Sequence, residues 1–327
     1  MSKVTFLVVC FLCSININYA QKGKRTLELI KLYNADGYYV IETVKSLPTT
    51  YQIGDVNIKT STSSTYEEYI EGTTEKEWIA STNTIVHEMN HAFSSQMVYK
   101  AVQDAQLPYT MNDKYIVIYT QNQSYLLIQF QEVFPSRELA ALIPTSLRTF
   151  RFDTYINSSS KILGTQQFGI YGLLNEWNAY YQGTKASLQL YDYYAKQNNN
   201  QAWLDYMQNV EGTLYAYQEF KFYILQYLLY AQKKHPIQYK QIIENTNFKQ
   251  AFVFVDTYFK KLIDEYFVIR QKIAENLSKQ NIKMEISEGY TFIEMKGIGN
   301  FSEEHALLND ELNKPIYTPL IQVLYTN

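Results

Sequence analysis

The stretch Thr84-Ile85-Val86-His87-Glu88-Met89-Asn90-His91-Ala92-Phe93 carries the clearest pattern in this chain of 327 residues. Its apolar residues belong to a stripe with helical spacing, which predicts an α-helix over about 75–105. Residues four apart project from one face of a helix, so His87 and His91 can direct their imidazoles at one metal ion. Glu88 then lies beside that ion, where its carboxylate can accept a proton from water. The pattern predicts two metal ligands and a general base.

The residues around these histidines resemble the extended motif of zincin-type metallopeptidases. That motif has uncharged flanks, Val or Thr three positions before the first His, a hydrophobic residue two positions after the second and no proline, and Thr84 to Phe93 matches it throughout. The resemblance implies Zn²⁺ as the cofactor and a peptide or protein as the substrate, hydrolysed by a zinc-activated water with Glu88 as general base. The alternative is a solvated helix that carries two histidines by accident.

A third protein ligand is expected downstream, because a catalytic zinc site uses three protein ligands and keeps one position open. Asn175-Glu176, followed by Ala179, resembles the Asn-Glu-x-x-Ala form in which the gluzincin branch supplies a glutamate. The resemblance makes Glu176 the expected third ligand. Its apolar neighbours indicate an inward-facing helix, where a carboxylate needs a partner. The alternative is a glutamate at the helix edge that pairs with a Lys or Tyr.

The separation of His91 from Glu176 is much longer than in compact thermolysin-like enzymes. An alternating pattern over about 114–133 predicts a β-hairpin, which we interpret as part of an insertion between the two metal-binding helices. The residue four positions after Glu176 is Tyr180, where this family often has an Asp that orients the first histidine. Asp192, Asn178 or Tyr180 could fill that role.

Two further roles have several candidates in the sequence. A donor for the transition-state oxyanion could be Tyr171, Tyr180 or His235. Arg148 and Arg151 could bind a substrate carboxylate, although pairing with local acids is the more ordinary use of such residues.

The remaining pattern predicts a helical body with β-structure at both ends. Aromatic and β-branched residues with turn signals at Asp36-Gly37 and Gly54-Asp55 indicate a β-rich lead-in over 21–74. Helical spacing extends over 164–278. Alternation over about 282–301 predicts a C-terminal β-hairpin.

Local signals add detail to these elements. The helical body is expected to break near Gly183, Asn198-Asn199-Asn200 and His235-Pro236. His305, beside Glu303 and Glu304, is expected at a solvated helix start. Together the elements predict an α+β fold, a predominantly helical zincin-like metallopeptidase domain with β-hairpin insertions over 21–327.

The first 20 residues have the features of a secretory signal peptide: Lys3, an apolar run from Phe6 to Cys13, and Ala20 before the expected cleavage point. The protein is therefore expected to be secreted or periplasmic. A surface lipoprotein acylated at Cys10 or Cys13 is the alternative. Both cysteines of the chain lie in this segment, so no disulfide is expected after cleavage.

Composition narrows the function classes. A formal net charge of -3 gives nucleic acid no electrostatic reason to bind, and no later stretch is long and uncharged enough to be a transmembrane segment. The 31 tyrosines either replace Phe and Leu on helix faces, with their hydroxyls at the surface, or form platforms that bind sugars or peptides. The alternative to a peptidase is therefore a non-catalytic zinc-binding or carbohydrate-binding surface protein that retains a zincin-like fold.

Overall fold

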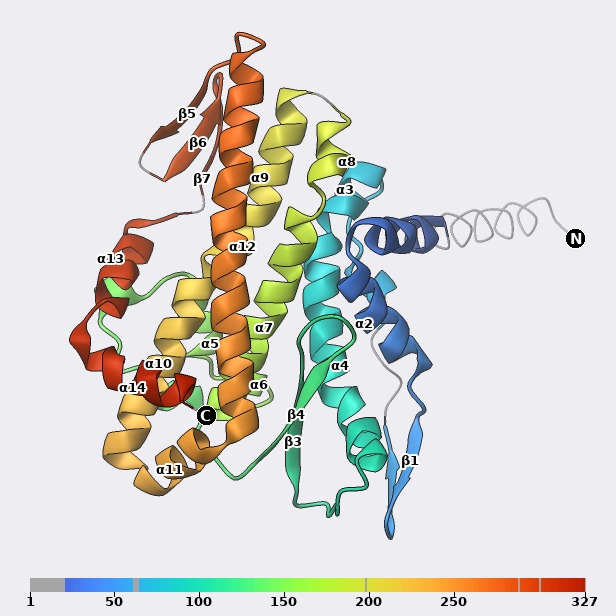
Figure 1. Ribbon diagram of the computed structural model, residues 1–327, viewed down its shortest axis with the longest axis vertical. Coiled ribbons are helices and arrows are strands. Elements are labelled where there is room, and N and C mark those ends of the chain that lie inside the picture. Colours follow the sequence, from blue (N-terminus) through green and yellow to red (C-terminus); the bar gives the residue numbers. More distant parts are fainter. Residues whose placement is uncertain (1–20, 61–64, 198, 288, 300, 327) are drawn as a thin grey trace, which may run out of the picture.

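The protein is an α+β protein, mostly helical with small antiparallel sheets (Figure 1). The computed structural model describes residues 21–60, 65–197, 199–287, 289–299 and 301–326, so the expected signal peptide lies outside the described residues. A first helix covers 21–33. The other α-helices are α2 (Ala35–Ser46), α3 (Glu75–Ala80), α4 (Thr82–Asp104), α5 (Arg151–Tyr155), α6 (Gly164–Gln167), α7 (Gly169–Leu188), α8 (Tyr191–Ala195), α9 (Asn200–Leu214), α10 (Ala216–Lys234), α11 (Pro236–Glu244), α12 (Thr246–Ser278), α13 (Glu303–Leu312) and α14 (Thr318–Tyr325).

The strands pair only with neighbours in sequence. They form three small sheets, made of β1 (Thr50–Ile53) with β2 (Val56–Lys59), β3 (Lys114–Tyr119) with β4 (Tyr125–Phe130), and β5 (Met284–Ser287), β6 (Tyr290–Ile293) and β7 (Lys296–Gly299). Short 3₁₀ turns, η1 (Tyr66–Tyr69), η2 (Ser136–Leu139), η3 (Thr145–Leu147) and η4 (Pro315–Tyr317), connect the larger elements.

Helices α4 and α7 form the antiparallel pair that positions the site. Asn83 near the start of α4 donates to Ser187 near the end of α7, and Ser94 further along α4 donates to Asn175 near the start of α7. Where the helices come closest, a Cβ on Gly183 would lie 2.6 Å from the side-chain oxygen of Asn83. The break expected at Gly183 is therefore wrong: this glycine lies inside α7 and permits close helix packing.

The prediction of β-structure is also wrong for the first half of the lead-in, because 21–33 and α2 are helical. The aromatic and β-branched residues here follow helical spacing, and Val40, Ile41 and Val44 are buried on one face of α2. The supposed turn at Asp36-Gly37 is the first turn of this helix. A side chain on Gly37 would collide with Val86 of α4, which explains the glycine. Only β1 and β2 confirm β-structure in the lead-in.

The hairpin expected over 114–133 is confirmed. β3 and β4 pair antiparallel from Lys114↔Phe130 to Tyr119↔Tyr125. Asn122 and Gln123 adopt positive φ angles of 52° and 61° at its turn, a conformation that favours a tight hairpin. The hairpin lies against α4 (Figure 1).

The helical spacing of 164–278 is confirmed, as are two of its breaks. The Asn199 side chain caps α9 by accepting from the Ala202 amide, and Pro236 begins α11. The C-terminal region differs from the expected hairpin, because a third strand, β7, pairs with β6. The sequence of β7, Lys-Gly-Ile-Gly, lacks the apolar alternation that predicts a strand. Its two glycines are required by packing, because the rings of Phe292 and Tyr290 occupy the space where their side chains would lie.

The interior has two hydrophobic clusters on either side of the α4–α7 pair. The larger contains Trp177, Phe220 and Phe252 from the helical body, and the smaller contains Ile41 and Phe93. Most of the largest fully buried side chains are tyrosines, among them Tyr206, Tyr223, Tyr227 and Tyr266. None of the described helices is long and apolar enough to cross a membrane.

Candidate metal centre

His87 and His91 on α4 lie next to Glu176 on α7. Their potential ligand atoms all lie within 4.8 Å of one another. The His91 Nε2 atom is 3.1 Å from His87 Nε2 and 3.2 Å from Glu176 Oε2, and His87 Nε2 is 3.7 Å from Glu176 Oε2. The structure therefore brings together the three residues that the sequence nominates as ligands.

The chemistry of this cluster fits a metal ion. The side chains of His87 and Glu176 are only 10% and 9% exposed, so a solitary carboxylate here would carry a large desolvation cost. Beyond the two histidines, Glu176 Oε2 has no hydrogen-bond partner among the described residues. Two imidazoles and one carboxylate form a common donor set for a catalytic zinc ion. The buried group of His87, His91 and Glu176 could hold a metal ion.

The protonation states of the two histidines differ. Burial, together with the charges of His91 and Arg151, holds the pKa of His87 well below its ordinary value. Burial is also the largest influence on His91 and opposes its protonation, but the charge and hydrogen bond of Glu176, together with Glu88 and Asn175, outweigh it and raise the pKa of His91. Without a metal, protonation is thus favoured at His91, beside Glu176, and disfavoured at His87. A metal cation would replace that proton as the partner of the carboxylate.

Glu88 follows His87 on α4 and is half-buried. Burial raises the pKa of Glu88; the charge of His91 opposes this rise and that of Glu176 adds to it. A raised pKa makes this carboxylate a better proton acceptor near neutral pH. The position and the electrostatics suit the general base that the sequence predicts.

Asn175 and Tyr180 hold the imidazoles in place. The Asn175 side chain lies near His91 and favours its protonated form, and its oxygen accepts a hydrogen bond from Ser94 at 2.9 Å. The Tyr180 ring lies edge-on to His87, with 4.6 Å between ring centroids. Of the orienting residues considered from the sequence, Tyr180 contacts a histidine, whereas Asp192 is exposed on α8 and Asn178 is buried with neither amide atom hydrogen-bonded within the described chain. Asn175 was missed, although it stands next to Glu176 in the motif.

Tyr155, on α5, joins the site from a third element. Its hydroxyl lies 2.9 Å from that of Tyr180. Burial raises the pKa of Tyr155, and the nearby charge of Glu176 raises it further, so the hydroxyl remains a neutral donor. No signal in the sequence points to Tyr155, because it belongs to no motif and is one of 31 tyrosines.

Arg151 supports these tyrosines from the interior. Its guanidinium lies 4.6 Å from the centroid of the Tyr180 ring and pairs with Glu219 of α10 at 2.6 Å. The Arg151 side chain is only 4% exposed. Arg151 therefore forms an interior ion pair, which is the local pairing with an acid considered from the sequence. Arg148 donates to the backbone oxygens of Ile143 and Ala140.

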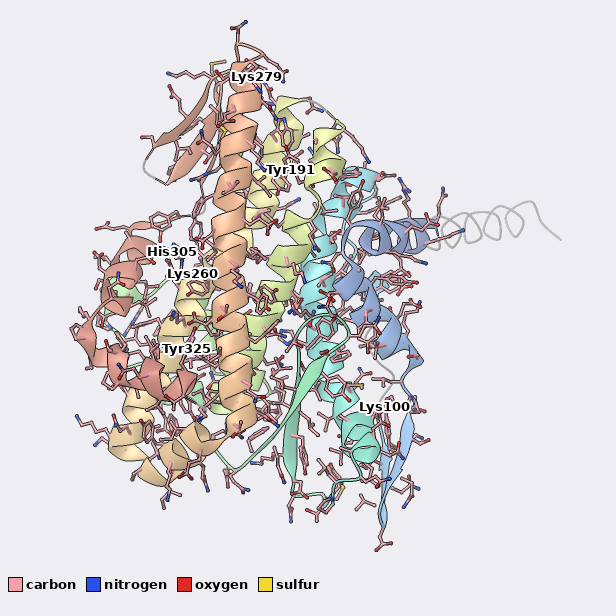
Figure 2. All side chains as sticks on the ribbon, viewed as in Figure 1. Lys100, Tyr191, Lys260, Lys279, His305 and Tyr325 are labelled. Carbon is pink, nitrogen blue, oxygen red and sulfur yellow. The ribbon has the colours of Figure 1, made fainter. Side chains whose placement is uncertain are left out.

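His305 is buried, which corrects the expected solvated helix start. It does lie in the first turn of α13, after Ser302, but it is 1% exposed, and its Nε2 atom is 3.3 Å from Glu219 Oε1. Figure 2 shows it where α13 meets the helical body. The local sequence, with Glu303 and Glu304 alongside, does not reveal the buried carboxylate of Glu219 that holds His305.

The other oxyanion candidates have partners of their own. Tyr171 is buried and stacks on Phe130, with 4.4 Å between centroids. His235 pairs with Glu138 at 3.2 Å and stacks on Phe134. Neither makes a contact with the cluster among the interactions of the described residues. Of the original candidates, Tyr180 alone lies against a proposed ligand.

Comparisons of this chain with protein-family profiles, curated proteins and solved structures give no match.

Proposed function

We propose that this protein is an exported zinc-dependent metallopeptidase of the zincin type, similar to the gluzincin branch. The observation that carries the proposal is the convergence of His87, His91 and Glu176 from two helices, with Glu88 beside them. In this proposal the three residues hold one zinc ion. When bound, zinc supplies a Lewis acid that polarises a carbonyl and lowers the pKa of water.

The chain's own residues supply the remaining chemistry. Glu88 accepts a proton from the attacking water and later donates it to the amine that leaves. Tyr155 and Tyr180 present paired hydroxyls from which a hydrogen bond can reach the substrate carbonyl oxygen as its negative charge grows. Asn175 and Tyr180 keep the histidines oriented.

Two features favour a peptidase over a carbohydrate-binding protein. Many tyrosines pack in the core, which accounts for much of their abundance without sugar platforms. A metal-binding protein without catalysis has no need for a carboxylate of raised pKa directly after its first ligand, as Glu88 is.

The substitution Glu88→Gln tests this proposal. Because the amide cannot accept the proton, turnover of a randomised peptide mixture is expected to fall by about 10²–10⁴-fold. Zinc content, measured by elemental analysis, is expected to stay at the wild-type level because no ligand is removed. Undiminished cleavage by the variant, or no cleavage of the mixture by the zinc-loaded wild type, would overturn the proposal.

A further inference from the structure

A cavity of about 270 Å³ lies beside the candidate metal centre. It is lined by Ser94 and Ser95 of α4 and by Asn175 of α7. Asn175 is the residue that contacts His91 and directly precedes Glu176. The cavity and the metal centre therefore share a wall.

The rest of the lining is largely aromatic. Tyr109 lies between Tyr99 and Tyr115, with 6.2 Å between its ring centroid and each of theirs, and Phe130 meets Phe168 edge-on at 6.0 Å. Because each ring packs against another, the walls are fixed before a ligand arrives. The cavity thus offers a preformed, largely aromatic surface, with the polar groups of Ser94, Ser95 and Asn175 on its α4–α7 side and the charged pair Asp113 and Lys114 elsewhere in the lining.

The charged residues of the lining do not favour a charged ligand. Asp113 and Lys114 are adjacent and opposite in sign. The carboxylate of Asp113 already accepts hydrogen bonds from the Thr110 amide at 2.6 Å and from Gln129 at 3.2 Å. The two opposite charges leave the lining without net charge, so it favours neither an acidic nor a basic group overall. A neutral aromatic or long apolar group matches this lining best.

The volume of the cavity suits a single amino-acid side chain better than a whole small molecule. Sites for whole small molecules are larger, at about 300–1,000 Å³. Along α4, Ser95 and Tyr99 follow His91 by about 6 and 12 Å, at a helical rise of about 1.5 Å per residue. An extended peptide advances about 3.3 Å per residue, so the cavity lies about two to four residues from a bond placed at the metal centre.

We propose that this cavity is a specificity pocket for an aromatic or long apolar side chain of an extended peptide, two to four residues from the cleaved bond. The inference rests on the proposed peptidase function. Full burial of a large apolar side chain favours binding by about 10- to 100-fold over alanine.

Profiling of the cleavage products by mass spectrometry tests the pocket. With a randomised peptide mixture, the zinc-loaded wild type is expected to prefer Phe, Tyr or Leu over Ala by at least tenfold at one such position. Ser95→Trp fills the cavity from an exposed position on α4, so it should abolish the preference. Gln96→Trp is the matched control, because the neighbouring Gln96 does not line the cavity, and it should preserve the preference.

A binding measurement separates this inference from the proposed function. Saturation-transfer NMR of the zinc-loaded Glu88→Gln variant should detect N-acetyl-phenylalaninamide but not N-acetyl-alaninamide, and adding Ser95→Trp should remove the signal. Tyr109→Ala, which takes away a wall, should weaken it as well. This pattern without any cleavage by the wild type would support the pocket and contradict the peptidase. Cleavage with no such preference, a preference that survives Ser95→Trp, or equal binding of the two amides would overturn the pocket.

Discussion

At the residue scale, Tyr155 differs from the other groups of the candidate site because it comes from outside α4 and α7, the helices that carry the candidate ligands. Its hydroxyl reaches the site through Tyr180, and its ring packs against Phe220. A neutral donor near Glu176 is suited to a carbonyl oxygen that gains charge in the transition state.

Substitution of Tyr155 by Phe keeps the ring and removes this donor. We expect kcat to fall by about 10²–10³-fold with KM and zinc content nearly unchanged. Tyr194→Phe is the control, since the Tyr194 hydroxyl accepts from Asn209 and has no contact with the cluster. Equal kcat values for Tyr155→Phe and the wild type would exclude Tyr155 from the chemistry.

The same scale shows what a sequence can predict about a site. His87 and His91 could be predicted as ligands because helical spacing alone places them on one face of a helix. Glu176 could be predicted because its neighbours resemble a known motif. Tyr155 and the partner of His305 depend on how distant helices pack. No local pattern carries that information, so both escaped prediction.

At the scale of elements, the site depends on the close contact between α4 and α7. A Cβ at Gly183 would lie 2.8 Å from the backbone oxygen of Asn83 and 3.3 Å from the Cβ of His87. Any side chain there must push the two helices apart. The ligands that face one another across this contact would then separate.

Gly183→Ala is therefore expected to lower the free energy of unfolding by about 1–3 kcal/mol and to weaken zinc binding. Gly212→Ala is the matched control: Gly212 also lies within a helix, α9, but a Cβ there would meet nothing within 4 Å. That change should be neutral or stabilise by up to about 1 kcal/mol. Chemical denaturation and zinc titration measure both effects. Wild-type zinc affinity in Gly183→Ala would contradict this role of the contact.

A second element-scale contact attaches α2 to α7 and β3. Asp36 accepts from Lys185 at 2.5 Å and from Tyr119 at 2.6 Å. Burial alone would raise the pKa of Asp36, but these hydrogen bonds and the charge of Lys185 bring it below its ordinary value of 3.8. Because the folded-state pKa is lowered, this carboxylate stabilises the fold above about pH 4, and the contribution is lost as the pH falls through the folded-state value.

Asp36→Asn is expected to reduce the free energy of unfolding at pH 7 by about 1–3 kcal/mol. The difference from the wild type should shrink below about pH 4, as the wild-type carboxylate becomes protonated. Asp104→Asn, which removes the exposed pair with Lys100, should cost no more than about 1 kcal/mol. Urea denaturation at several pH values measures these differences. A gap between Asp36→Asn and wild type that widens toward pH 3 would contradict the assignment.

The prediction of elements succeeded where spacing was long or alternation was clear, as for α12 and the β3–β4 hairpin. It failed at α2, where residues with strand propensity lie on a helical face that packs against α4. Tertiary packing overrides local propensity there. The strand β7 was not predicted, because glycine does not favour strands and its two glycines are explained only by the rings of β6 that pack against them.

At the scale of the whole molecule, the candidate centre lies between two hydrophobic clusters. One cluster buries the outer side of α4 and the other that of α7, so the two helices meet with the polar residues of the candidate centre facing each other. The α+β class was predictable from the element pattern. The arrangement of helices around α7 was not, since it rests on contacts between residues far apart in the sequence.

The central claim is that His87, His91 and Glu176 hold one zinc ion while Glu88 remains free to transfer protons. Zinc stoichiometry of two purified glutamate variants, measured by elemental analysis after dialysis against trace zinc, tests it most directly. Glu88→Gln should retain about one zinc per chain, as the wild type does, and Glu176→Gln should retain almost none, because it loses a charged ligand. Equal zinc content in wild type and Glu176→Gln, or loss of zinc in Glu88→Gln, would contradict the account.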